Sequence, residues 1–199
     1  MANNEGFEIT SKEPGWIKKK VPDTYADDSL IELVLFYVIN TPCTDLSSSS
    51  ISILSYGWKK DVWKKGKLKE ALFDVAKLIP QKTFISAKKT DEMKVACRKA
   101  KLTEGFYKNR NEERIAIYKP SRYNEFLAIC YHIRNSFAHG RLAMHAIKGN
   151  PTDIMFVLED GVPYNGQFQV RSRMLLKRST LLTWMKIIQK GKLEDGKDG

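Results

Sequence analysis

PSRYNEFLAICYHIRNSFAHG, residues 120–140, has the apolar spacing of an amphipathic helix. Pro120 and Ser121 suit the opening of a helix, and Gly140 suits the left-handed position that follows a last turn. Apolar side chains recur between these ends at steps of three and four, which places them on one side of the helix. They are Tyr123, Phe126, Cys130, Ile133 and Phe137. We therefore predict a helix that packs this stripe into the core.

Three polar residues cluster near the end of this helix. Asn135 and His139 are four residues apart and share one face. That face points away from the apolar stripe, so we expect both side chains to reach solvent or a second subunit. Arg134 lies on the flank, where its stem packs while its guanidinium stays available. His139 falls in the last turn.

This trio suits RNA cleavage through the 2′-hydroxyl of the RNA itself, which needs a base for the 2′ proton and an acid for the leaving 5′ oxygen. Histidine titrates near neutral pH and serves in either role. The planar fork of Arg134 binds phosphate oxygens and stabilises charge that grows in the transition state. Asn135 either orients the imidazole or holds the phosphate. One chain supplies one such histidine, so two copies about a two-fold axis would complete the acid and the base.

Arg134, Asn135 and His139 resemble the signature of the HEPN superfamily, Arg-x(4–6)-His, often with Asn directly after the Arg. The resemblance implies a mainly α fold, a HEPN-like helical bundle with a small β-hairpin between the motif helix and the C-terminal helix. It also implies a metal-independent endoribonuclease without a cofactor, whose composite active site lies in a homodimer. Products would carry a 2′,3′-cyclic phosphate and a 5′-hydroxyl. Such relatives act in toxin–antitoxin, abortive-infection and CRISPR-linked defence, with an antitoxin or defence-system partner protein.

One position departs from the family pattern. HEPN toxins that a nucleotidyltransferase partner silences often carry a tyrosine two places after the histidine, and this chain has Arg141 there. Modification of a tyrosine at that position is therefore not expected. Arg141 is instead a candidate for an additional phosphate contact.

Other interpretations of the same residues stay open. One is a non-catalytic HEPN module that binds RNA or a partner protein as an accessory or regulatory subunit, because folds are reused without their chemistry. Another is a purely structural helical dimer. A third is a plain helix C-terminus, in which His139 complements the helix dipole and Arg134 forms a surface ion pair.

Composition favours an anionic partner. The 199 residues carry a formal net charge of +11, from 34 Lys and Arg against 23 Asp and Glu. Such a surface attracts polyanions, RNA first among them, and a lysine-rich surface that only confers solubility is the alternative. Cys43, Cys97 and Cys130 favour neither a disulfide framework nor a zinc site. The polar N-terminus lacks a signal peptide, and no stretch suits a membrane span, so we predict a cytoplasmic protein.

The length fits one domain, which we place at residues 25–190, between an irregular arm (1–24) and a disordered tail (191–199). Ser29-x-x-Glu32 predicts a capping box that opens an apolar, central helix ending at Pro42. Two β-rich segments, 153–158 and 167–170, predict a hairpin with a long loop. The other predicted elements are helices over residues 67–79, 91–102 and 172–189 and a short strand over residues 114–119.

Three further features have a structural interpretation that we favour. His132 falls near the far side of the apolar stripe and is expected to be structural or solvated, not catalytic. His145 is expected in an exposed loop. Residues 58–65 interleave tryptophans with lysines, as single-stranded RNA binders do, but core tryptophans with solvated lysines are the simpler interpretation.

Overall fold

A five-stranded mixed sheet, in the order β1-β2-β5-β4-β3, forms the centre of the molecule. The structure is a computed structural model that describes residues 23–42, 51–59, 67–103, 105–108, 112–165 and 167–191. β1 runs parallel to β2, and the other neighbouring strands are antiparallel. The predicted mainly α HEPN-like helical bundle with one small hairpin is therefore wrong, because the described chain forms an α/β fold.

Along the chain, α5, the helix that carries Arg134, follows β2 and precedes β3. The strands are β1 Phe84–Ala87, β2 Arg114–Tyr118, β3 Leu142–Ile147, β4 Asn150–Tyr164 and β5 Gln167–Lys177. The α-helices are α1 Asp28–Val34, α3 Lys67–Ala76, α4 Met93–Lys99, α5 Glu125–Ala138 and α6 Arg178–Lys190. Shorter helical segments are η1 Asp23–Tyr25, η2 Leu35–Asn40, η3 Ile53–Tyr56 and η4 Phe106–Lys108, of which η2 is π-helical. Residues 1–22 of the predicted arm, residues 192–199 of the predicted tail and Cys43 lie outside the described residues.

Much of the sheet was not predicted from the sequence, because its strand β4 is buried on both faces. Every residue of β4 from Asp153 to Asp160 is buried, so this strand lacks the alternation of polar and apolar residues that marks a half-exposed strand. The predicted hairpin exists as β4 and β5, but these strands are longer than predicted, because β4 ends only at Tyr164 and β5 already begins at Gln167.

Two element boundaries also differ from expectation. β5 continues through Met174, Leu175 and Leu176, which we expected to be helical, so α6 begins only at Arg178. β3 starts directly after the turn that ends α5, so His145 lies in a strand and not in a loop. The strand predicted at residues 114–119 is confirmed as β2.

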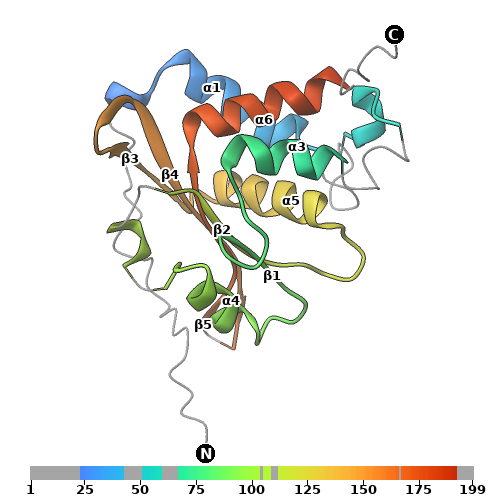
Figure 1. Ribbon diagram of the computed structural model, residues 1–199, viewed down its shortest axis with the longest axis vertical. Helices are drawn as coiled ribbons and strands as arrows, with labels where there is room; N and C mark the ends of the chain where they lie inside the picture. The colour runs from blue at the N-terminus through green and yellow to red at the C-terminus, as the bar shows by residue number, and fades with distance from the viewer. Residues whose placement is uncertain are drawn as a thin grey trace, which may run out of the picture.

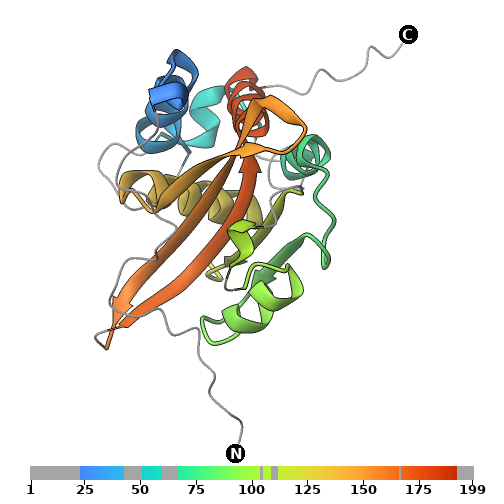
Figure 2. The same cartoon turned by 90° about the vertical axis from the view of Figure 1, so that its left-hand side faces the viewer.

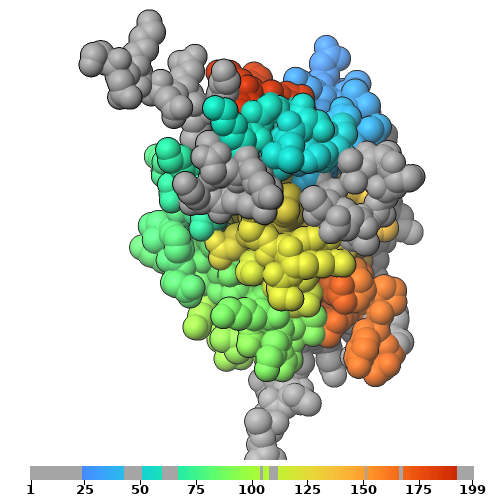
Figure 3. Space-filling model, turned by 90° about the vertical axis from the view of Figure 1, so that its right-hand side faces the viewer, coloured from blue at the N-terminus to red at the C-terminus, as the bar shows by residue number. Residues whose placement is uncertain are grey.

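Helices cover the two faces of the sheet unequally. α1, α3, α5 and α6 lie on one face, where most of the apolar core gathers, and α4 with η4 lies on the other (Figure 1). In Figure 2, the long β4–β5 ribbon separates α5 from α4. The face seen in Figure 3 includes the segments of η3 (cyan), of α5 and the loop before it (yellow), and of β1 and α4 (green), with an orange segment of the β4–β5 ribbon at its lower right. α5 is therefore the helix that lies between the sheet and the outer helices.

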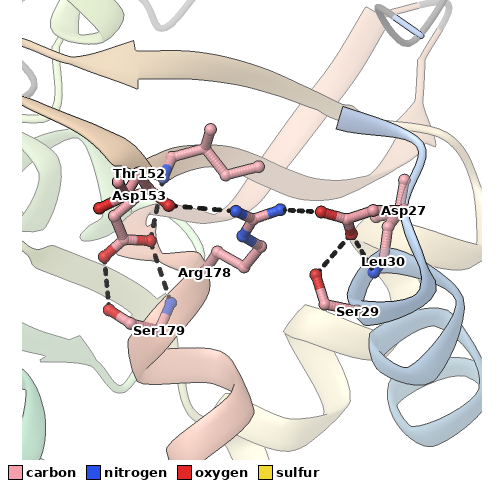
Figure 4. A network of polar contacts seen from close by, with 8 residues as sticks. Asp27, Ser29, Leu30, Thr152, Asp153, Arg178 and Ser179 are labelled. Carbon is pink, nitrogen blue, oxygen red and sulfur yellow. Dashed lines mark hydrogen bonds and ion pairs between the residues drawn. The ribbon is translucent and has the colours of Figure 1, made fainter. Parts of the chain in front are cut away.

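α1 starts from a different cap than the predicted capping box. Asp27 is the N-cap, and its carboxylate accepts a hydrogen bond from the Leu30 N–H at 3.1 Å. Ser29 instead donates its hydroxyl to Asp27. The Arg178 guanidinium donates to the same aspartate at 2.6 Å and to the Thr152 carbonyl at 3.2 Å (Figure 4). This network joins the starts of α1 and α6 to β4.

The helical segment from α1 into η2 is only partly central. Leu33, Phe36 and Tyr37 are buried in the core. Ile31 and Ile39 are 59% and 57% exposed, so the expectation of a fully central helix is wrong for the outer side of this segment.

The described tryptophans anchor the outer helices to one another. Trp58 is 2% exposed, and its indole N–H donates to the Ile188 carbonyl of α6 at 2.7 Å. Trp184 of α6 donates in the same way to the Leu72 carbonyl of α3 at 2.8 Å. The core interpretation of Trp58 is thus confirmed, while residues 60–65 of that stretch lie outside the described residues. None of the described helices is long and apolar enough to cross a membrane.

A buried carboxylate stabilises the start of α6. Glu113 is 7% exposed, and its carboxylate accepts hydrogen bonds from the Lys177 N–H at 2.8 Å and the Thr180 hydroxyl at 3.0 Å. Burial raises the pKa of Glu113 to about 7, although both hydrogen bonds act to lower it. The folded protein therefore holds this proton more tightly than the unfolded chain does.

We expect the stability contribution of Glu113 to be complete below about pH 4.5 and to be lost as the pH rises through about 7. Glu113→Gln keeps an acceptor for Lys177 and cannot ionise, so the variant should be more stable than the wild type at pH 8, by about 3 kcal/mol or less. Urea unfolding at pH 5 to 8 measures this difference. Glu70→Gln, at an exposed position on α3, is the control. Equal pH slopes for Glu113→Gln and the wild type would contradict the assignment.

Candidate functional site

The end of α5 forms a Schellman cap, as the glycine in the sequence predicts. The Arg141 N–H donates to the Ser136 carbonyl at 2.9 Å, and the Gly140 N–H donates to the Phe137 carbonyl at 3.1 Å. Gly140 has a φ of +63°, a left-handed conformation that glycine adopts without strain. His139 is the C-cap residue, and its side chain is exposed. The cap thus fixes the backbone of His139 at the surface.

Asn135 is buried, although the helical spacing predicts it on an exposed face of α5. Its side chain is 8% exposed and faces the sheet, so the prediction that it reaches solvent is wrong. The physical reason is that α5 is covered by the sheet as well as by the outer helices, so its buried arc is wider than the apolar stripe. Asn135 does share a helical row with His132, on the side that packs against β4.

Arg134 lies beside Asn135, at the surface end of this buried polar group. Its guanidinium is partly exposed and donates from Nη1 to the Asn135 side-chain oxygen at 3.2 Å. Within the described chain this is the one hydrogen bond of that guanidinium. The remaining N–H groups of Arg134 are therefore available to an anion at the surface.

Asp160 connects the asparagine to His132. The Asn135 amide donates to the Asp160 carboxylate at 3.3 Å, and the same oxygen contacts His132 Nδ1 at 2.7 Å. His132 is fully buried, and Asp160 is 3% exposed. Of the two interpretations for His132, the structural one holds and the solvated one does not.

Both nitrogens of the His132 ring face acceptors. Nε2 lies 2.7 Å from the Tyr118 carbonyl oxygen, which only accepts, so Nε2 carries a hydrogen. A hydrogen also lies between Nδ1 and the Asp160 carboxyl oxygen, because these two atoms form a hydrogen bond only when one of them carries a hydrogen. The imidazole and the carboxylate thus form a saturated, buried pair that spans β2, α5 and β4.

A β-bulge places the Asp160 side chain in this network. The register of β4 against β5 shifts between Asp160 and Gly161. A Cβ on Gly161 would lie 2.3 Å from the Gln169 carbonyl oxygen, so the close approach of the strands there requires glycine. Asp160 was not predicted as a site residue, because Asp160-Gly161 has the composition of a turn. The signal that could have found it is the apolar run directly before it, which extends a buried strand.

Arg141 is engaged on the opposite face of the sheet. Its guanidinium forms an ion pair with Glu159, which is fully buried, and stacks over the Phe168 ring at 3.7 Å. Glu159 also pairs with Arg173 at 2.9 Å. The predicted phosphate contact of Arg141 stays a prediction, and any phosphate there competes with the buried carboxylate for the guanidinium.

The described residues show no cluster that suits a metal ion. Among these residues, no three His, Cys, Asp or Glu side chains come together as a metal site requires. Cys97 and Cys130 are buried cysteines, and burial raises the pKa of Cys97 to about 12. His145 stacks on Tyr107 at a centroid distance of 6.5 Å, on the other side of the sheet from α5.

Comparisons with protein-family models, with curated proteins and with solved structures find no match for this chain.

Proposed function

We propose that this chain is a metal-independent endoribonuclease that works as a homodimer. The observation that carries the proposal is that two accessible side chains lie near the same end of α5: Arg134, held by Asn135, and His139, exposed on the helix cap. The proposal rests on this motif and its chemistry, not on a shared architecture, because the helical bundle that the HEPN resemblance implied is not the fold of this chain.

His139 acts as the general acid or base, and Arg134 binds the scissile phosphate. The Arg134 fork stabilises the charge that builds on the phosphate oxygens as the 2′-oxygen attacks. Asn135 does not reach the substrate in this scheme, because it is buried and bonded to Arg134 and Asp160. It holds the guanidinium, which replaces both roles that the sequence suggested for it.

The reaction needs an acid and a base, and each chain offers one exposed histidine at the end of α5. His132 is buried with both ring nitrogens hydrogen-bonded, and His145 lies in β3 across the sheet. A second copy related by a two-fold axis supplies the second His139 to a shared cleft. The products then carry a 2′,3′-cyclic phosphate and a 5′-hydroxyl, and chelators leave the reaction intact.

The charge of the chain supports an RNA substrate. The net charge is +11, and several of the exposed cations lie on and around α4. They are Lys88, Lys89, Arg98, Lys99 and Lys101. A cytoplasmic role in a toxin–antitoxin, abortive-infection or other antiviral system, with a partner protein that restrains or activates cleavage, is the context we propose.

The second candidate function is a non-catalytic module that binds RNA or a partner protein. The observation that favours it is the burial of Asn135, which leaves two of the three motif side chains at the surface. A binding module retains Arg134 as an anion contact and does not use His139 as an acid or base.

Expression in a growing bacterial host, followed by mapping of cellular RNA ends, separates the two candidates. We expect the wild type to arrest growth and to generate discrete new 5′-hydroxyl ends, whereas His139→Ala does neither. Equal RNA ends in both strains, together with RNA that copurifies with both proteins, would support the binding module and contradict the enzyme.

A further inference from the structure

We propose that His132 and Asp160 are positioning residues that set the orientation of the Arg134 guanidinium through Asn135. The effect on catalysis rests on the proposed function, but the orientation itself does not. Four hydrogen-bond contacts lead from the sheet to the surface: Tyr118 carbonyl to His132 at 2.7 Å, His132 to Asp160 at 2.7 Å, Asp160 to Asn135 at 3.3 Å and Asn135 to Arg134 at 3.2 Å.

Each contact determines the orientation of the next group. The Tyr118 carbonyl and the Asp160 carboxylate fix both edges of the His132 ring. The Asp160 oxygen that faces Asn135 already shares one hydrogen with His132, so it accepts from the amide and selects the rotamer of Asn135 that presents Nδ2 inward and Oδ1 outward. With the opposite rotamer, Nδ2 would face the guanidinium, and two donors do not bond. Asp160 thereby decides whether Asn135 offers an acceptor to Arg134.

Burial makes this arrangement rigid. His132, Asp160 and Asn135 are 0%, 3% and 8% exposed, so water does not substitute for a lost partner without disturbing the packing. A well-packed apolar group at these positions would avoid the desolvation of a carboxylate, so stability alone does not account for the network. The groups come from β2, α5 and β4, which are regular elements that support a fixed geometry better than loops do.

Asp160→Asn tests the inference, because it keeps the shape of the side chain and replaces one carboxyl oxygen by an amide nitrogen that donates. In an RNA cleavage assay we expect kcat/KM to fall about 10- to 100-fold, as for a displaced catalytic group. Combined with Arg134→Ala, the loss should be no larger than for Arg134→Ala alone, because both changes remove one guanidinium contact. Additive losses would show that Asp160 acts elsewhere and would overturn the inference.

A measurement that does not depend on activity distinguishes failure of this inference from failure of the proposed function. The side-chain NMR signals of ¹⁵N-labelled Arg134, assigned with Arg134→Lys, report whether the guanidinium is held. We expect a restrained guanidinium in the wild type and a freely rotating one in Asp160→Asn. If the wild type does not cleave RNA, the proposed function fails, and this signal alone decides the inference: an unchanged Arg134 signal overturns it.

Asp153→Asn is the matched control. Asp153 is buried at 9% exposure on the same strand and receives the Ser179 N–H at the start of α6, away from Arg134. We expect this variant to lower the unfolding midpoint while the Arg134 signal stays as in the wild type. If Asp160→Asn does not fold, Asn135→Ala removes the next contact in the same series of hydrogen bonds. Its effects on kcat/KM and on the Arg134 NMR signal then test the inference.

Discussion

Replacing His139 by alanine is expected to lower the rate of RNA cleavage by about 10²- to 10⁴-fold, the usual contribution of a general acid or base. His139 is the motif residue best placed for proton transfer, because its side chain is exposed and the helix cap fixes its backbone. Single-turnover cleavage of an end-labelled RNA, with enzyme in excess, measures the chemical step without product release.

The fold of His139→Ala should be unchanged. The imidazole has no hydrogen-bond partner within the described chain, so the unfolding free energy should shift by about 0.5 kcal/mol or less. His145→Ala, which removes a histidine on the other side of the sheet, is the control and should keep cleavage within a few-fold of the wild type. A His139→Ala protein that is folded and fully active would remove this residue from the mechanism.

Replacing Arg134 by alanine is expected to lower kcat/KM by about 10²- to 10³-fold, the range for loss of one group that stabilises transition-state charge. Arg134→Lys keeps the positive charge but loses the planar fork and the geometry of the bond to Asn135. We therefore expect an intermediate loss for the lysine variant, mainly in kcat if the fork acts in the transition state. Steady-state kinetics over a range of RNA concentrations separates kcat from KM.

Arg98→Ala is the control for charge alone, because Arg98 is exposed on α4, on the opposite face of the sheet from α5. It removes the same formal charge, so it should weaken RNA binding modestly and leave kcat unchanged. Equal losses for Arg98→Ala and Arg134→Ala would show that Arg134 contributes only to the general attraction of RNA.

The local structure of α5 could be predicted because local signals determine it. The apolar spacing from Phe126 to Phe137 predicts the helix, and Gly140 predicts its end. The structure confirms both, with a Schellman cap at that end. The position of His139 on that cap follows from the same two signals. Helix propensity, apolar periodicity and capping depend on residues that are close in the sequence, so the sequence alone is enough to recognise them.

The sheet and the orientation of Asn135 could not be read in the same way, because they depend on contacts between distant segments. β4 is buried on both faces, so its apolar run carries no strand period. Asn135 turns inward because Asp160, 25 positions away in the chain, accepts its amide hydrogen. A helical wheel places side chains relative to one stripe and does not show how much of the helix the sheet covers.

The most direct test of the proposed mechanism is cleavage of an end-labelled RNA by the purified protein in excess EDTA, beside His139→Ala under the same conditions. We predict that the wild type cuts and leaves a 2′,3′-cyclic phosphate and a 5′-hydroxyl, while His139→Ala leaves the RNA intact. Cleavage that EDTA abolishes, or fragments that carry a 5′-phosphate, would contradict the mechanism built on Arg134 and His139.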